Sequence, residues 1–344
     1  MKRLIILIIA TCFLTASAVG GADREITLMT HDSFNVSKEV LAEFEQKNKV
    51  RLRFLKVGDA GSAVNQAILS KNNPMADVFF GVDNTFMSRA LKAGIFEPYR
   101  SEQLQHIPDR LKLDPQFRLL PVDFGDVCLN YDKQWFRKRN LTPPQGLDDL
   151  VKPAYKGLTV VENPATSSPG LSFLFATIGY FGESAFLDFW KQLRASDVLV
   201  VNGWEEAYWG HFSAASKGDR PIVVSYASSP PVEVFYAKEK PEEAPTAAVV
   251  SDRSCFRQIE FIGILKGTEQ RELSEKLIDF MLGTTFQEDI PLQMFVFPAN
   301  RKAKLPDVFT KHAVIADNPV VLSSEKITAK REQWIEDWTD TVLR

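Results

Sequence analysis

The sequence predicts an α/β protein of two lobes. After residue 23, β-rich apolar runs alternate with helical segments along most of the chain, which is typical of parallel strands covered by helices. The chain is 45% hydrophobic. At this composition, about 320 residues are enough to build two cores rather than one. No apolar run after residue 23 reaches the length needed to cross a membrane.

The first residues have the order of a secretory signal peptide. Lys2 and Arg3 precede an apolar run over residues 4–14, and small residues follow at 16–22. This order predicts an exported protein whose leader, residues 1–22, is cleaved near residues 18–22. A membrane anchor is the alternative, but the apolar run is short for a span.

Charge and cysteine usage exclude several classes of function. The formal net charge is −3, or −5 without Lys2 and Arg3, and no basic tract is present, so nucleic-acid binding has no electrostatic support. Cys128 and Cys255 are the only cysteines after Cys12, and no Cys/His cluster has zinc-ligand spacing. We therefore expect no structural metal.

Three predicted βα loops in the first part of the chain carry a short acid or hydroxyl. Asp32 and Ser33 stand in the first loop, Asp59 in the second and Asp83 in the third. Each acid alone is most simply a helix cap. Because the carboxyl ends of parallel strands open onto one crevice, the acids together indicate a ligand site. The preceding strands are predicted at residues 25–30, 50–57 and 76–82.

Two later strands are expected to form the hinge between the lobes. The run 119–132 is long, β-rich and broken by Gly125, and 255–264 reads as the strand that returns. Cys128 and Cys255 fall in these two strands, so we expect them to lie close together; whether they form a disulfide stays open. We assign residues 23–124 and 255–300 to lobe 1 and 125–254 to lobe 2, with 301–344 as a helical segment of unassigned lobe.

The second lobe offers a polar loop and two aromatic residues at strand ends. Hydroxyls of Ser167 and Ser168 gather at a helix start, which suits an anion or a polar substituent, although a plain capped turn has the same residues. Trp204 and Tyr226 each follow a predicted buried strand, as expected of a ligand floor or of core aromatics. Aromatic walls with acidic neighbours favour a flat, cationic or amine-bearing ligand.

Enzyme signatures are not found. The chain has no P-loop, GxGxxG, HExxH or GxSxG motif. Glu205 and Glu206 are adjacent, so they point in different directions and cannot flank one bond. A hydrolase with a scattered triad is the alternative to a binding protein without catalysis or cofactor.

Five stretches occur in a characteristic order and spacing: residues 30–34, 76–84, 163–170, 203–208 and 225–230. Together they resemble the thiamine-binding periplasmic proteins of ABC transporters, over nearly the whole chain after residue 25. The resemblance implies a two-lobed type II periplasmic binding-protein fold that closes on its ligand. It also implies a periplasmic, monomeric protein that delivers thiamine or thiamine phosphate to a membrane permease.

The resemblance also implies roles for single residues. Asp59 resembles the acid that meets the ligand, Ser167 or Ser168 a hydroxyl contact, and Trp204 and Tyr226 the aromatic walls. The expected ligand contacts are His31, Asp32, Ser33, Asp59, Asp83, Ser167, Ser168, Trp204, Tyr208, Tyr226, Ser229 and Phe295.

The chain departs from the family pattern at three aromatic positions. His31, Val232 and Phe295 stand where the family tends to have two tyrosines and a tryptophan, so we expect a thinner aromatic cage. Ferric ion, or another small cation in the same fold, is the alternative ligand. Related families hold ferric ion with paired tyrosines, and Tyr226 has no adjacent tyrosine.

Overall fold

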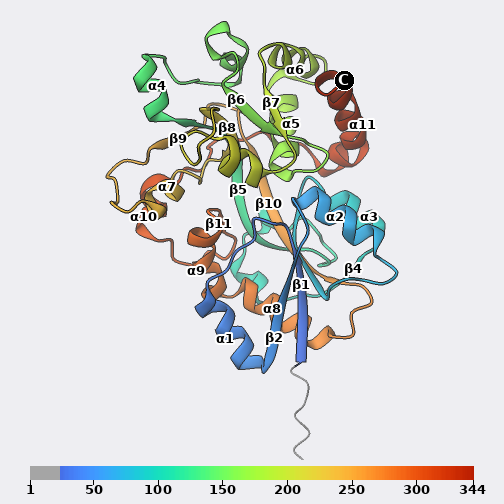
Figure 1. Ribbon diagram of the computed structural model, residues 1–344. Coiled ribbons are helices and arrows are strands. Elements are labelled where there is room, and N and C mark those ends of the chain that lie inside the picture. Colours follow the sequence, from blue (N-terminus) through green and yellow to red (C-terminus); the bar gives the residue numbers. More distant parts are fainter. Residues whose placement is uncertain (1–23) are drawn as a thin grey trace, which may run out of the picture.

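The computed structural model describes residues 24–344 and shows two lobes connected through one continuous sheet (Figure 1). The strand order is β2-β1-β3-β10-β5-β8-β6-β7. In addition, β11 and β9 pair with β5, and β4 pairs with β10. Lobe 1 holds the amino-terminal strands and lobe 2 the strands from β6 to β9. The predicted signal peptide, residues 1–22, lies outside the described residues.

The three predicted strands of lobe 1 are parallel neighbours, as expected. β1 lies between β2 and β3, with Ile26 opposite Leu52 and Leu28 opposite Val78. The loops after β1 and β2 therefore open onto the same edge of the sheet. The elements of lobe 1 up to the hinge are β1 (Arg24–Thr30), α1 (Lys38–Asn48), β2 (Val50–Lys56), α2 (Ala60–Leu69), β3 (Val78–Asp83), α3 (Met87–Ala93), β4 (Phe96–Glu97), η1 (Glu102–His106) and η2 (Asp109–Leu111).

Two long strands pass between the lobes, which confirms the predicted hinge. β5 (Leu120–Asp132) pairs with β10 (Phe256–Leu265) along its first half and with β8 and β9 along its second half. The expected break at Gly125 is wrong, because Gly125 continues the ladder opposite Gln258. The exact lobe boundaries stay a prediction.

The sheet of lobe 2 extends from the second half of β5, which pairs with β8 and β9. β8 lies between β5 and the parallel pair β6 and β7. The elements between the hinge strands are α4 (Lys133–Arg139), η3 (Leu147–Val151), η4 (Pro153–Tyr155), β6 (Thr159–Glu162), α5 (Ser168–Phe181), α6 (Phe186–Ala195), β7 (Leu199–Val201), the π-helix η5 (Glu206–His211), β8 (Ile222–Tyr226), α7 (Pro231–Tyr236) and β9 (Thr246–Val249).

The segment after β10 first packs on lobe 1 and ends in a helix that contacts both lobes. The carboxyl-terminal helix packs against α6 and α3 and buries Trp334 and Trp338, so it covers parts of both lobes. The elements are α8 (Arg271–Leu282), α9 (Thr284–Gln293), β11 (Phe297–Pro298), α10 (Asp307–His312) and α11 (Ser324–Val342).

Several helix boundaries differ from the sequence-based expectation. α3 begins at Met87, because Asp83 accepts hydrogen bonds from Thr85 and Phe86 and forms a turn before the helix. α4, α7 and α9 were not predicted, and α9 contains Pro291. Among residues 24–344 no single helix is long and apolar enough to cross a membrane, and the pair α5 and α6 passes that test only together while bent by 119°.

Cys128 and Cys255 lie near each other at the hinge, which confirms their expected proximity. Val127 of β5 is opposite Phe256 of β10, so the next position along this antiparallel register brings Cys128 to Cys255. Both are free thiols and fully buried in one small cluster. Burial and the neighbouring Cys255 thiol raise the pKa of Cys128 well above its usual value.

Burial predicts that neither thiol is reactive in the folded protein. With the chain from residue 24, a thiol reagent should label neither cysteine under native conditions, because both sulfur atoms are fully buried and inaccessible to the reagent. In denaturant without reductant it should label both. Failure to label either cysteine in denaturant would show a Cys128–Cys255 disulfide instead.

A candidate ligand-binding cleft between the lobes

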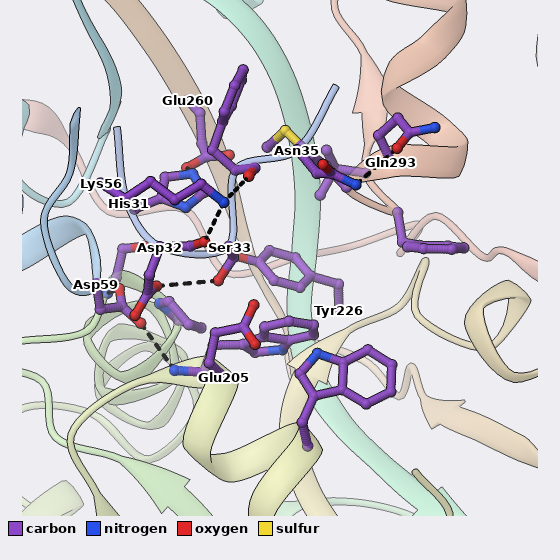
Figure 2. Close-up of a pocket in the computed structure, with 18 of the residues that line it drawn as sticks. His31, Asp32, Ser33, Asn35, Lys56, Asp59, Glu205, Tyr226, Glu260 and Gln293 are labelled. Atoms are coloured by element: carbon purple, nitrogen blue, oxygen red, sulfur yellow. Dashed lines mark hydrogen bonds and ion pairs between the residues drawn. The ribbon is translucent and has the colours of Figure 1, made fainter. Parts of the chain in front are cut away.

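A cleft lies where the carboxyl ends of the lobe 1 strands face the loops of lobe 2. It contains about 910 Å³ of empty space including its open mouth, a size typical of small-molecule sites. Lobe 1 contributes the loop after β1, lobe 2 contributes the residues around Trp204 and the end of β8, and the segment after α9 closes one side. Figure 2 shows the side chains of this cleft.

Asp59 connects the two lobes. One carboxylate oxygen, Oδ1, accepts from the backbone N–H of Ala60 in its own lobe (2.6 Å) and of Ser168 in lobe 2 (3.2 Å). The other, Oδ2, accepts from the N–H of Trp204 at 2.9 Å (Figure 2). Ser168 begins α5, so a carboxylate of one lobe caps a helix of the other. Burial raises the pKa of Asp59, while the N–H of Trp204 opposes this rise.

Trp204 forms an aromatic wall whose position is fixed from two sides. Its indole N–H donates to the Ser225 hydroxyl at 2.9 Å. Its ring stacks on Tyr208, with centroids 4.9 Å apart and planes at 22°. The Tyr208 hydroxyl donates to Glu233, so Tyr208 supports Trp204 from behind.

Tyr226 forms a second wall at the carboxyl end of β8. Its hydroxyl donates to Gln258 Oε1 at 3.1 Å, and the Gln258 amide donates to the Ser168 hydroxyl at 3.0 Å. A Cβ on Gly125 would lie 2.7 Å from the Tyr226 ring, so glycine is needed at that position of β5. Gly125 of β5 and Gln258 of β10 thus fix the position of the Tyr226 ring.

His31 and Glu260 form an ion pair at the base of the cleft. His31 Nε2 lies 3.2 Å from Glu260 Oε1, and both side chains are largely buried (Figure 2). Burial lowers the pKa of His31, but the charge and hydrogen bond of Glu260, together with the charges of Asp59 and Asp32, outweigh burial, and the pKa is raised overall. Gly81 makes room for the imidazole: its φ is +103°, and a Cβ there would lie 2.4 Å from His31 Cδ2.

Lys56 orders the loop that follows β1. Its ammonium group donates to the carbonyl oxygens of Asp32 (3.0 Å) and Phe34 (2.7 Å). Asn35 donates to Gln293 of α9 at 2.8 Å and so ties the loop to the far side of the cleft (Figure 2). The loop is therefore held in place before any ligand contacts it.

Carboxyl groups dominate the charge of the cleft lining. They number four against one lysine and one histidine, and the lysine already bonds to carbonyls while the histidine pairs with Glu260. Burial also raises the pKa of Glu205. A positively charged ligand is the natural complement of such a lining. The four acids are Asp32, Asp59, Glu205 and Glu260.

Eight of the twelve predicted contacts line the cleft. They come from both lobes and from the segment after α9, so residues that are 264 positions apart in sequence meet at one site. Their contact with a ligand stays a prediction. They are His31, Asp32, Ser33, Asp59, Ser168, Trp204, Tyr226 and Phe295.

The other four predicted contacts are buried and do not line the cleft. Asp83 bonds within its own turn, although burial raises its pKa to about 7. Ser167 caps α5 through the Gly170 N–H, and Tyr208 lies behind Trp204. Ser229 bonds to Ser225 and to the Tyr226 N–H, so it supports both aromatic walls. Ser167, Tyr208 and Ser229 therefore support lining residues, whereas Asp83 stabilises only its own turn.

Some lining residues were not predicted. Trp209 and Tyr236 add two aromatic rings, so the cage is less thin than Val232 and Phe295 suggested. Trp209 lies in the π-helix, and the sequence carries no clear signal for that helix type. Glu260 and Lys56 line the cleft from β10 and β2. β10 also contains Arg257 and the buried Gln258, so the sequence carries no signal that distinguishes Glu260 as a cleft residue.

The lobe contact of Asp59 leads to a structural prediction. Hydrogen bonds to a charged group contribute about 1.5–3 kcal/mol each. Asp59→Asn removes the charge and places an amide N–H₂ against backbone donors, so the lobes should separate. Small-angle scattering should then show a larger radius of gyration. Asp32→Asn is the matched control, because Asp32 receives one long bond from Ser33 (3.4 Å) and bridges no lobes. An unchanged radius for Asp59→Asn would contradict this account.

Solved structures of periplasmic binding proteins have the same fold. A structure described as a periplasmic thiamin binding protein superposes with a TM-score of 0.81 at 26% identity, covering 93% of this chain and 96% of the other. A ferric binding protein from Campylobacter jejuni superposes with a TM-score of 0.73 at 17% identity, covering 92% and 99%, which shows the fold alone. The chain therefore has the two-lobed fold of type II periplasmic binding proteins, as its resemblance implied.

Sequence relatives extend over nearly the full length. A thiamine-binding periplasmic protein of Salmonella typhimurium is 29% identical over 336 residues, covering 96% of this chain and 97% of the relative. One from Escherichia coli is 29% identical over 324 residues, covering 93% and 94%. The family model for bacterial extracellular solute-binding proteins matches residues 73–316, more than half of the sequence. This chain belongs to the bacterial extracellular solute-binding protein family.

Proposed function

We propose that this protein captures thiamine, or a thiamine phosphate, in the periplasm and delivers it as a monomer to the permease of an ABC transporter. Its family consists of transport components that bind solutes and carry out no chemistry. Relatives that match nearly the whole chain are named thiamine-binding proteins, which supports this ligand. In this proposal thiamine is the cargo, and the protein needs no cofactor.

The charge and aromatic character of the cleft are the observation that carries the proposal. Thiamine joins a permanently cationic thiazolium ring to an aminopyrimidine ring, and both rings are flat. Trp204 and Tyr226 offer ring faces, and the lining acids outnumber its cations. Aromatic faces and carboxylates each attract an organic cation, and they do so more strongly where water is excluded.

Ferric ion fits this cleft less well. In related families paired tyrosines hold ferric ion, whereas Ala227 follows Tyr226 here and the Tyr226 hydroxyl already donates to Gln258. No group of three or more His, Cys, Asp or Glu side chains suited to a metal occurs within residues 24–344. A tyrosinate colour on adding ferric ion would favour that ligand over thiamine.

Calorimetry of the refolded chain against thiamine tests the proposal. We expect saturable binding at thiamine concentrations well below millimolar. Trp204→Ala should weaken it on the order of 10-fold, because stacking and cation–π contact with a ring are lost. Trp135→Ala is the matched control: Trp135 lies on α4 and packs against Phe136 and Arg139, away from the cleft. No heat of binding at millimolar thiamine would refute the ligand and leave the fold unaffected.

Binding should also release protons. Burial raises the pKa of Asp59 and of Glu205, and the pKa of His31 is raised as well. A cation placed among these groups lowers all three pKa values, because each group then loses its proton more readily. Thiamine affinity should therefore increase as the pH rises from the ordinary carboxyl range through the raised pKa of His31, and calorimetry in buffers of different ionisation enthalpy should detect the released protons. Affinity that falls with rising pH would contradict the assigned charges.

A further inference from the structure

Two aromatic residues of the cleft are unusually exposed. Trp209 is 39% exposed and Tyr236 is 59% exposed, although both line the same cleft as Trp204 and Tyr226. We call Trp209 and Tyr236 the outer pair, and Trp204 and Tyr226 the inner pair. Large aromatic side chains left open to water at a concave site indicate a binding surface.

The polar atoms of the two pairs differ in their partners. In the inner pair, the Trp204 indole N–H donates to Ser225 and the Tyr226 hydroxyl donates to Gln258. Within residues 24–344, no hydrogen bond of the Trp209 indole N–H or the Tyr236 hydroxyl to another residue is found. The inner rings are thus locked by the protein, whereas the outer rings keep polar groups available to a ligand.

The outer pair continues the aromatic surface of the inner pair toward the cleft mouth. The Trp209 ring lies 6.2 Å from Trp204 at 86° and 6.5 Å from Tyr236 at 76°. Tyr236 in turn lies 5.9 Å from Phe295. These distances are typical of interacting aromatic rings. The exposed members of this surface have room for one more ring against them.

The buried charges lie beside the inner pair. Asp59 accepts from the backbone N–H of Trp204, and among the charges around Tyr226 that of Glu260 raises the pKa of Tyr226 most. Among the described residues that line the cleft, the acids are Asp32, Asp59, Glu205 and Glu260, whereas η5, α7 and the segment after α9, which carry the outer pair and Phe295, contribute no acid to the lining. The inner part of the cleft therefore suits a charged ring and the outer part suits a neutral one.

We propose that Trp209 and Tyr236 form a second subsite, which binds the neutral ring of a two-ring cation while the inner pair binds its charged ring. This inference rests on the proposed function and specifies how the site selects its ligand. The outer pair would distinguish thiamine from a cation with a single ring. It would also supply aromatic surface in place of the tyrosine and tryptophan that the family tends to have at the positions of Val232 and Phe295.

The test compares thiamine with its thiazolium half, an N-methylated hydroxyethyl thiazolium. The double variant Trp209→Ala/Tyr236→Ala should weaken thiamine binding about 10-fold or more, because two ring contacts are lost. The affinity for the thiazolium should stay within about 2-fold, since that ring is expected at the inner pair. Val321→Ala, which shortens a side chain that is 84% exposed, is the control for loss of a surface apolar group.

Three results would overturn the inference, and they are distinguishable. If the wild-type protein binds thiamine and the double variant binds it equally well, the outer subsite is refuted and the proposed function stands. If the variant loses thiamine and thiazolium affinity to the same extent, the two pairs do not form separate subsites. If the wild-type protein does not bind thiamine, the proposed function fails and this inference fails with it. Thermal unfolding of the double variant verifies that its fold is retained. The single variant Trp209→Phe, which keeps an aromatic ring at this position, is unfolded in the same way for comparison.

Discussion

The carboxylate of Asp59 is the interaction on which the arrangement of the cleft depends. It stands at the end of a lobe 1 loop and accepts backbone N–H groups from Ser168 and Trp204 of lobe 2. A helix start carries unpaired N–H groups, so a carboxylate from the opposite lobe satisfies donors that would otherwise need water or a ligand. The same contact sets the distance between the Trp204 wall and the His31–Glu260 pair. One side chain thus couples the closure of the lobes to the shape of the site.

Much of the fold could be predicted because its signals are local. The alternation of strand and helix, the parallel trio β1–β3 and the hinge strands β5 and β10 all follow from apolar runs and caps such as Ser37. Boundaries were less predictable, because turn chemistry competes with helix initiation. At Asp83, bonds to Thr85 and Phe86 form a turn and delay the helix to Met87. The π-helix that contains Trp209 has no recognisable periodic pattern in the sequence.

The site was predictable where a residue's role depends on its place at a strand end. Asp32, Asp59 and Asp83 occupy equivalent loops, yet only Asp32 and Asp59 reach the cleft, because the carboxylate of Asp83 is used within its own turn. Sequence alone does not distinguish these cases, since both are ordinary uses of an aspartate. Glu260 lies on a hinge strand and reaches the cleft only after β10 pairs with β5, a long-range contact that no local pattern reports. Gln258 of the same strand stays buried and bonds to Tyr226 and Ser168.

Acids at the cleft base, locked inner rings and open outer rings together describe a site for a flat organic cation held between two lobes. A crystal structure of the protein with thiamine tests this claim most directly. The account predicts a closed protein with the thiazolium ring against Trp204 and Tyr226, near Asp59 and Glu260, and the pyrimidine ring against Trp209 and Tyr236. Thiamine bound outside the cleft, or within it but away from Trp204 and Tyr226, would contradict the account.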